Sequence, residues 1–323
     1  MNNIAVSTRV RFARNLKRYP FVGCMNLSQR EELISLVKTA LEKAAPGVFE
    51  YYPMNELSDI KAAMLVEEKL ISHELDKDSG FVAISHDRTS SIMLGEEDHL
   101  RICNILPGLA LGETLSSADK IDDILDQRLD YAFDENLGFL TNCPTNLGTG
   151  MRASVILHLP ALEKAEFIPV ITGSIGKLGL TVRGSYGEGT KVSGALYSIS
   201  NQVTLGISEI ESVSKLDTVV NQIMEREESA RERMRKNDRY EDEIFRNYGI
   251  MRYARVMPLD EFMELSSWLR LGAPIMGISE RDIDRLTVMA SPAHLCGDTI
   301  LSPEEINKKR ADVVREFLGK GKI

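Results

Sequence analysis

Alternation of apolar and polar positions marks strands in the first two thirds of the chain. β-Branched residues alternate along residues 4–12, which places Arg9 and Arg11 together on the opposite face of a strand. The apolar runs Phe81–Ser85 and Ser90–Leu94, joined by a four-residue polar turn, predict a hairpin. Further strands are expected at 138–143, 152–159, 180–183 and 195–199.

Signals for helix starts and ends lie between these strands. Ser28 and Glu31 form an S-x-x-E capping box ahead of an apolar helix face, and Pro46 and Gly47 end that helix. A second helix is expected at 57–70. From Ser208 onward the pattern is helical to the end, with two more capping boxes at 279–282 and 302–305.

This order of elements predicts an α+β fold: a largely antiparallel β-sheet flanked by helices, followed by a C-terminal helical region. The composition changes near residue 230. Residues 225–243 hold eight acids and six bases, a pattern typical of a solvated, salt-bridged helix face. We therefore expect one domain over 1–230 and a helical region over 231–323.

Composition narrows the function classes. The 323 residues carry a formal net charge of −9, which argues against nucleic acid as the main ligand. No apolar run is long enough for a transmembrane helix or a signal-peptide core, so no membrane contact and a cytoplasmic location are expected. The four cysteines are far apart without a C-x-x-C pair, which favours reduced thiols over a zinc cluster, and no protein metal site is expected.

Chemistry-bearing residues gather in five short clusters, whereas the P-loop and G-x-G-x-x-G fingerprints are absent. Four clusters hold arginines in strand-like or glycine-rich surroundings. In an acidic protein such arginines suggest an anionic partner, and guanidinium groups bind phosphates through paired hydrogen bonds. Each arginine taken singly would more often be an ordinary surface residue. The clusters are 7–11 (STRVR), 96–101 (EEDHLR), 143–152 (CPTNLGTGMR), 183–188 (RGSYGE) and 200–202 (SNQ).

These clusters, in this order and spacing, resemble the phosphagen kinase (ATP:guanidino phosphotransferase) family, and within it the branch that phosphorylates protein arginine. The likeness runs from about residue 7 to about residue 317. It implies a phosphagen kinase or glutamine synthetase-like catalytic domain and a C-terminal region for dimerisation or regulation. Two other hypotheses about function stay open: a small-molecule guanidino kinase such as arginine kinase, and a catalytically silent adaptor.

The resemblance implies three catalytic residues. Glu97 and Glu188 match the carboxylates that contact the substrate guanidinium, and which of them takes the proton is left open. Cys143 matches the reactive cysteine beside that guanidinium; its surroundings could favour the thiolate.

The resemblance also implies ATP and Mg²⁺ as cofactors, with the ion bridging the phosphates. The arginines Arg9, Arg11, Arg101, Arg152 and Arg183 match those that hold the ATP phosphates. Main-chain groups of the same segments are expected to line the nucleotide pocket. The whole nucleotide-binding set is Ser7, Thr8, Arg9, Val10, Arg11, Arg101, Arg152, Ala153, Ser154, Val155, Ile156, Arg183, Gly184, Ser185, Tyr186 and Gly187.

The histidines are expected to be structural: His99 within the acidic motif, and His158 in the core. The family's adenine-contacting histidine has no evident counterpart. Lys69 stands near its position and His73 lies close by, so the adenine contact is left unassigned.

Substrate and partners follow from the same resemblance. Small-guanidine kinases carry a helical domain ahead of the first cluster, and only six residues precede Ser7 here, so an open site for exposed arginines of proteins is expected. The resemblance implies a McsA-like zinc-binding activator, a Clp protease that degrades the marked proteins, and a homodimer.

One departure concerns regulation. The branch carries an R-D-x-x-R-A motif that binds phosphoarginine, whereas residues 306–311 read INKKRA. Loss of the Arg-Asp pair removes one guanidinium group that could bind the phosphate through paired hydrogen bonds. We therefore expect weak or absent activation by phosphoarginine.

Overall fold

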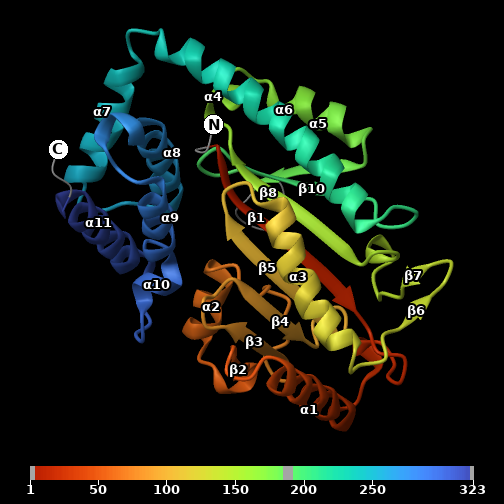
Figure 1. The fold of residues 1–323 in the computed structure, drawn as a ribbon. Coiled ribbons are helices and arrows are strands. Elements are labelled where there is room, and N and C mark those ends of the chain that lie inside the picture. Colours follow the sequence, from red (N-terminus) through yellow and green to blue (C-terminus); the bar gives the residue numbers. More distant parts are fainter. Residues whose placement is uncertain (1–3, 185–191, 321–323) are drawn as a thin grey trace.

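An eight-stranded antiparallel sheet forms the centre of the protein in a computed structural model that describes residues 4–184 and 192–320. This architecture confirms the predicted α+β class (Figure 1). The strand order is β2-β3-β4-β5-β1-β8-β10-β9. The strands are β1 Ala5–Arg14, β2 Phe49–Pro53, β3 Phe81–Ser85, β4 Ser90–Leu94, β5 Leu100–Pro107, β8 Met151–His158, β9 Leu180–Gly184 and β10 Leu196–Asn201.

The predicted hairpin β3–β4 is confirmed with its bounds, and β1, β8, β9 and β10 lie where strands were expected. The strand expected at 138–143 is wrong beyond Phe139. Only Gly138–Phe139 (β7) is extended, paired with Phe133–Asp134 (β6), and the chain then enters a short 3₁₀ helix, Pro144–Asn146 (η3).

Three helices cover one face of the sheet: α1 Leu27–Ala44, α3 Leu111–Asp126 and α6 Glu209–Arg235 (Figure 1). The capping box expected at Ser28 is wrong. Helix α1 starts earlier because the Asn26 side chain accepts from the Gln29 amide, and the Gln29 side chain accepts from the Asn26 amide. Asn26 is an equally good N-cap residue, so the box moves by two positions.

The opposite face of the sheet is only partly covered. Helix α2, Asp59–Glu67, packs over β2–β4, burying Leu65 against Val82, Ile84 and Met93. Alternation along each strand separates the two faces: Val10 and Phe12 of β1 enter the main core beneath α1, α3 and α6, whereas Arg9 and Arg11 point to the other side.

The C-terminal region has a core of its own, built by α7 Tyr240–Tyr253, α8 Leu259–Met276, α9 Glu280–Met289, α10 Pro292–Cys296 and α11 Pro303–Lys320. The capping box at Ser302 and Glu305 is confirmed, with Pro303 as the first residue of α11. The box expected at 279–282 is wrong, because the Ser279 side chain makes no capping hydrogen bond. The short helices α4 Pro160–Lys164 and α5 Ile168–Gly176 belong to the first core.

Buried polar contacts fix α6, the helix that leads into the C-terminal region, to the first core. Glu227 of α6 is fully buried and accepts hydrogen bonds from the Ala161 and Leu162 amides at the start of α4 and from Arg231. Arg231 in turn donates to the carbonyl of His158 on β8. Every charge in this group is paired, as burial requires.

A connection between the sheet domain and the C-terminal region lies between α2 and α10. The Glu67 carboxylate accepts from the Ala293 amide at 2.7 Å and the His294 amide at 3.1 Å, and it contacts His294 Nδ1 at 2.7 Å. This contact ties the end of α2 to the C-terminal region. Among the described residues, no helix is long and apolar enough to cross a membrane.

Replacing Leu157, a fully buried residue of β8, by alanine should lower the free energy of unfolding by about 3 kcal/mol, because it leaves a cavity in the main core. Chemical denaturation measures this. Leu27→Ala is the matched control: Leu27 is 71% exposed, so its change should stay below about 0.5 kcal/mol. Equal losses in both variants would contradict the assigned core.

Candidate active site

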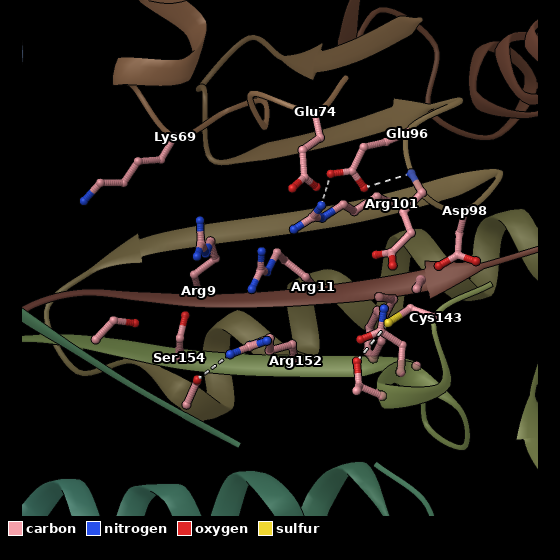
Figure 2. A pocket seen from close by; sticks show the side chains of 18 of the residues that line it. Arg9, Arg11, Lys69, Glu74, Glu96, Asp98, Arg101, Cys143, Arg152 and Ser154 are labelled. Atoms are coloured by element: carbon pink, nitrogen blue, oxygen red, sulfur yellow. Dashed lines mark hydrogen bonds and ion pairs between the residues drawn. The ribbon is translucent and has the colours of Figure 1, made fainter. Parts of the chain in front are cut away.

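A cavity of about 430 Å³ opens on the sheet face that α1, α3 and α6 leave free. Its floor is made by β1, β5, β8 and β10. Figure 2 shows Arg9 and Arg11 on one strand, Arg152 on the neighbouring strand, and Arg101 paired with Glu96 above them. Lys69 lies at one end of the cavity, and Cys143 lies at the other.

The five arginines expected to share a site all line this cavity. The strand register brings them together: Arg11 lies directly opposite Arg152 on β8, and Arg101 comes from β5 on the other side of β1. Arg183 of β9 is paired with Ser198 of β10, farther along the floor. Like charges in adjacent strand positions repel, so this arrangement indicates an anionic ligand.

Electrostatics agree with that inference. Burial, together with the guanidinium groups of Arg9 and Arg101, lowers the pKa of Arg11, and burial also lowers the pKa of Arg9 and of Arg152. The buried Nε of Arg11 has no hydrogen-bond partner within residues 4–184 and 192–320. A buried donor without a partner is unfavourable, and a phosphate oxygen would satisfy it.

Glu96 orients one side of the site. Its buried carboxylate pairs with Arg101, accepts from Ser72 Oγ at 2.5 Å and accepts from the Glu97 amide at 3.2 Å. The neighbouring Glu97 side chain is half-buried and lines the cavity. Glu96 therefore positions an arginine and the backbone of a candidate catalytic residue at once. The acidic motif contained Glu96, but the sequence analysis assigned a role only to Glu97.

Cys143 lies in the loop after β7, half-exposed, with its Sγ 3.0 Å from Thr145 Oγ1. A buried network ties this loop to the Glu97 loop. Asp98 Oδ1 accepts from the Asn142 amide at 2.7 Å and from Asn15 Nδ2 at 2.6 Å. The contact joins residues from three separate parts of the chain, so no local sequence signal could have identified it.

Tight backbone contacts hold the Cys143 loop from behind. Gly148 has φ +109°, and a Cβ atom there would lie 2.2 Å from the Thr204 carbonyl oxygen. Thr204 Oγ1 donates to the carbonyls of Thr145 and Leu147. Only glycine combines this conformation with so close an approach. The loop is thus fixed between β7 and the segment that follows β10.

Not every expected nucleotide residue faces the cavity. The side chains of Thr8, Val10, Ala153 and Val155 point to the opposite face of the sheet, because side chains alternate along a strand. Thr8 instead donates to the Gly108 carbonyl. Those that line the cavity, besides the arginines, are Ser154, Ile156 and Gly184, whereas Ser7 lines a neighbouring cavity. Ser185, Tyr186, Gly187 and the predicted catalytic Glu188 lie outside the described residues.

Both histidines have structural partners. His99 is fully buried between the Leu16 amide and the Pro20 carbonyl, and burial lowers its pKa. His158 is buried between Ser267 Oγ and Arg231. Of the cysteines other than Cys143, Cys103 is buried, Cys24 is exposed and Cys296 is intermediate.

Lys69 follows directly after α2 in a left-handed conformation, φ +65°, and lines the cavity near Arg9. Burial, reinforced by the charge of Arg9, lowers the pKa of Lys69 to about 8. Its charge therefore changes in a pH range where the arginines stay protonated.

Comparisons with known proteins agree with this site. Residues 32–230 match the family model "ATP:guanido phosphotransferase, C-terminal catalytic domain", and residues 237–322 match "Protein-arginine kinase McsB C-terminal domain". The chain belongs to the ATP:guanido phosphotransferase family. Within the family, it is 44% identical to the protein-arginine kinase of Caldanaerobacter subterraneus subsp. tengcongensis over 98% of each chain. It is 42% identical to that of Pelotomaculum thermopropionicum over 98% of this chain and 91% of that protein.

Solved structures of the family share the fold. A crystal structure of lombricine kinase superposes with a TM-score of 0.63 over 71% of this chain and 67% of that chain, at 24% identity. A duplicated taurocyamine kinase from Schistosoma mansoni with bound transition state analog components gives a TM-score of 0.63 over 86% of this chain and 47% of that chain, at 22% identity.

The titration of Lys69 predicts how anion binding depends on pH. Lys69 is charged below about pH 8 and neutral above it, so the affinity for inorganic tripolyphosphate should fall as the pH rises from 7 to 9. In Lys69→Met, the affinity for tripolyphosphate should fall between pH 7 and pH 9 by a factor about threefold smaller than in the wild-type protein. This difference is consistent with the loss of one partly screened charge contact.

Calorimetric titration of both proteins checks this, because the difference between the two profiles cancels the probe's own ionisation. Parallel profiles would show that the Lys69 charge does not act on the anion.

Proposed function

We propose that this protein transfers the γ-phosphate of ATP to the guanidinium of arginine side chains in proteins. The supporting observation is the arrangement of the cavity: Cys143 lies at one end (Figure 2), Asp98 ties the loop of Glu97 to the Cys143 loop, and the arginine cluster covers the floor beside them. An acceptor guanidinium at the first end and a triphosphate over the arginines would face each other for in-line transfer.

The acceptor end activates a poor nucleophile. A guanidinium has a pKa near 13, so a nitrogen lone pair becomes available only as a proton leaves. Glu97 would orient the group, and either Glu97 or Glu188 would accept that proton. Cys143 as a thiolate would stabilise the cation without forming a covalent bond. The new N–P bond forms as the bond between the γ-phosphorus and the bridging oxygen breaks, and ADP departs.

The phosphate end stabilises negative charge. The arginines would hold the phosphates in fixed positions and compensate charge that develops on the transferred group. Mg²⁺ supplies further compensation and, as is usual for this ion, would bind through phosphate oxygens and water. Arg101, fixed by Glu96, and Arg152, which donates to Ser200 Oγ at 3.2 Å, are the most constrained members.

Protein arginine is favoured over a small guanidine as substrate, because the relatives at 42–44% identity over nearly the whole chain are protein-arginine kinases. We also propose a division into a catalytic domain, 1–230, and a dimerisation or regulatory region, 231–323; separate hydrophobic cores support it. Exposed Phe245, Ile250 and Tyr253 on α7 suit a homodimer contact. A McsA-like activator, a Clp protease and a cytoplasmic location complete the proposal by resemblance.

Glu97→Gln should abolish arginine phosphorylation, lowering the rate by at least about a hundredfold, because the amide can neither accept the proton nor pair with the guanidinium. The assay incubates the protein with ATP, Mg²⁺ and casein, with and without an activator, and detects acid-labile, base-stable phosphoarginine by mass spectrometry.

Glu135→Gln is the matched control, since Glu135 is exposed beyond β6 and outside the cavity. Transfer to free arginine alone would indicate a small-guanidine kinase. Absence of any transfer from the wild-type protein would indicate the silent adaptor.

Added phosphoarginine should change the rate of casein phosphorylation by less than about twofold. The reason is that the Arg-Asp pair of the R-D-x-x-R-A motif, which would help bind its phosphate through paired hydrogen bonds, is absent. Arg310 is 1% exposed and already donates to the carbonyls of Ala290 and Met257 and to Asn307 Oδ1. Kinetics with and without phosphoarginine measure the effect. Strong activation that Arg310→Ala removes, and that exposed Lys309→Ala retains, would overturn this expectation.

A further inference from the structure

Three consecutive acids, Glu96, Glu97 and Asp98, lie in the loop between β4 and β5. The charge of Glu96 is compensated inside the protein, because Glu96 pairs with Arg101. Glu97 lines the cavity and is the proposed contact of the acceptor guanidinium. Asp98 lines the cavity as well, and Figure 2 shows it at the same end as Cys143. Asp98 is thus a further acid at the end where the acceptor would bind.

The Asp98 carboxylate is buried and hydrogen-bonded, but its printed donors are neutral groups. The residue is 2% exposed, and its Oδ1 accepts from Asn15 Nδ2 at 2.6 Å and from the Asn142 amide at 2.7 Å. Among residues 4–184 and 192–320, no basic side chain forms an ion pair with it. The adjacent His99 is fully buried, and burial lowers its pKa, so this histidine is neutral at neutral pH. The described part of the chain therefore leaves the negative charge of Asp98 uncompensated.

Such a charge is costly for the fold. Burial raises the pKa of Asp98, the hydrogen bonds from Asn142 and Asn15 oppose this change, and the charge of Glu96 adds to it. An asparagine could accept the same two hydrogen bonds through its side-chain oxygen without the cost of a buried charge. Stability alone therefore does not explain an acid at this position. A cation in the adjacent cavity does, because an opposite charge nearby favours the ionised form.

Asn15 fixes the position of this carboxylate. Asn15 is itself 2% exposed, and its side chain bonds at both ends. Its Nδ2 donates to Asp98 and, at 3.0 Å, to the Leu140 carbonyl, whereas its Oδ1 accepts from the His99 amide at 2.9 Å. These bonds join the acidic loop to the segment that leads into Cys143. The charge of Asp98 is therefore held in one place beside the cavity.

We propose that Asp98 makes the acceptor end specific for a cationic side chain, and that Asn15 is the residue that positions it. The uncompensated charge of Asp98 attracts a guanidinium and gives no such advantage to a neutral side chain of the same shape. Asp98 acts through its electric field and through the Cys143 loop that it holds, whereas Glu97 contacts the guanidinium. This inference rests on the proposed function, because it takes the acceptor to be an arginine side chain.

Binding of two matched peptides to the full-length protein tests the proposal. One peptide carries a single arginine, and the other carries citrulline at that position, which has nearly the same shape without the charge. Asp98→Asn keeps both hydrogen bonds and removes the charge. Its affinity for the arginine peptide should fall about tenfold, whereas its affinity for the citrulline peptide should stay within about twofold of wild type. Fluorescence anisotropy with labelled peptides measures both affinities without any phosphoryl transfer.

Two further variants serve as controls. Asp123→Asn removes one negative charge from an exposed position of α3 outside the cavity, so both affinities should stay within about twofold of wild type. Asp98→Glu keeps the charge on a longer side chain. It should weaken both peptides and still prefer arginine over citrulline. Retained binding of inorganic tripolyphosphate, which needs only the arginine cluster, shows that each variant is folded.

Equal losses for the two peptides in Asp98→Asn would show that Asp98 only supports the fold, and would overturn the proposal. Wild-type affinity of Asp98→Asn for the arginine peptide would also overturn it, because the charge would then not act on the acceptor. If the peptides behave as expected but the wild-type protein transfers no phosphate to casein, the proposed function alone is wrong.

Discussion

The mutual repulsion of arginines on one face of a β-sheet is the constraint on which the rest of the site depends. Arg11 and Arg152 lie directly opposite each other on neighbouring strands, with Arg9 and Arg101 close by. Such a cluster is unfavourable by itself and becomes favourable when a polyanion binds. The surrounding residues make it tolerable: Glu96 pairs with Arg101, Ser200 accepts from Arg152, and the main core holds the strands beneath.

Helices cover that face of the sheet from two sides and leave the cavity open between them. Helix α2 packs over β2–β4 and ends at Glu67, whose carboxylate binds the start of α10, while Lys69 two residues later lines the cavity. Helices α8 and α9 close the far end. Catalytic sheet and C-terminal region thus meet around the site, through contacts between residues more than two hundred positions apart.

Local sequence patterns were enough to predict much of the fold and of the candidate site. The hairpin β3–β4, the strand carrying Arg9 and Arg11, and the family motifs could be recognised because each depends on residues close in sequence. Strand β5 was missed because its apolar run follows directly on the acidic motif, which masked its start. The Asn15–Asp98–Asn142 network and the neighbouring cavity between β1 and α8 could not be predicted, since they exist only through tertiary packing.

The alternation along β1 also shapes how the protein can evolve. Ser7, Arg9 and Arg11 line the two neighbouring cavities, whereas the alternating residues Thr8, Val10 and Phe12 are held by hydrogen bonding or core packing. Tolerance to substitution should therefore alternate along the strand with a period of two residues. Volume-conserving changes should be accepted at residues 8, 10 and 12, and almost no changes at residues 7, 9 and 11. A one-residue insertion or deletion in this strand would exchange the two sets and remove stability and activity together, so the segment can drift by substitution but not in length.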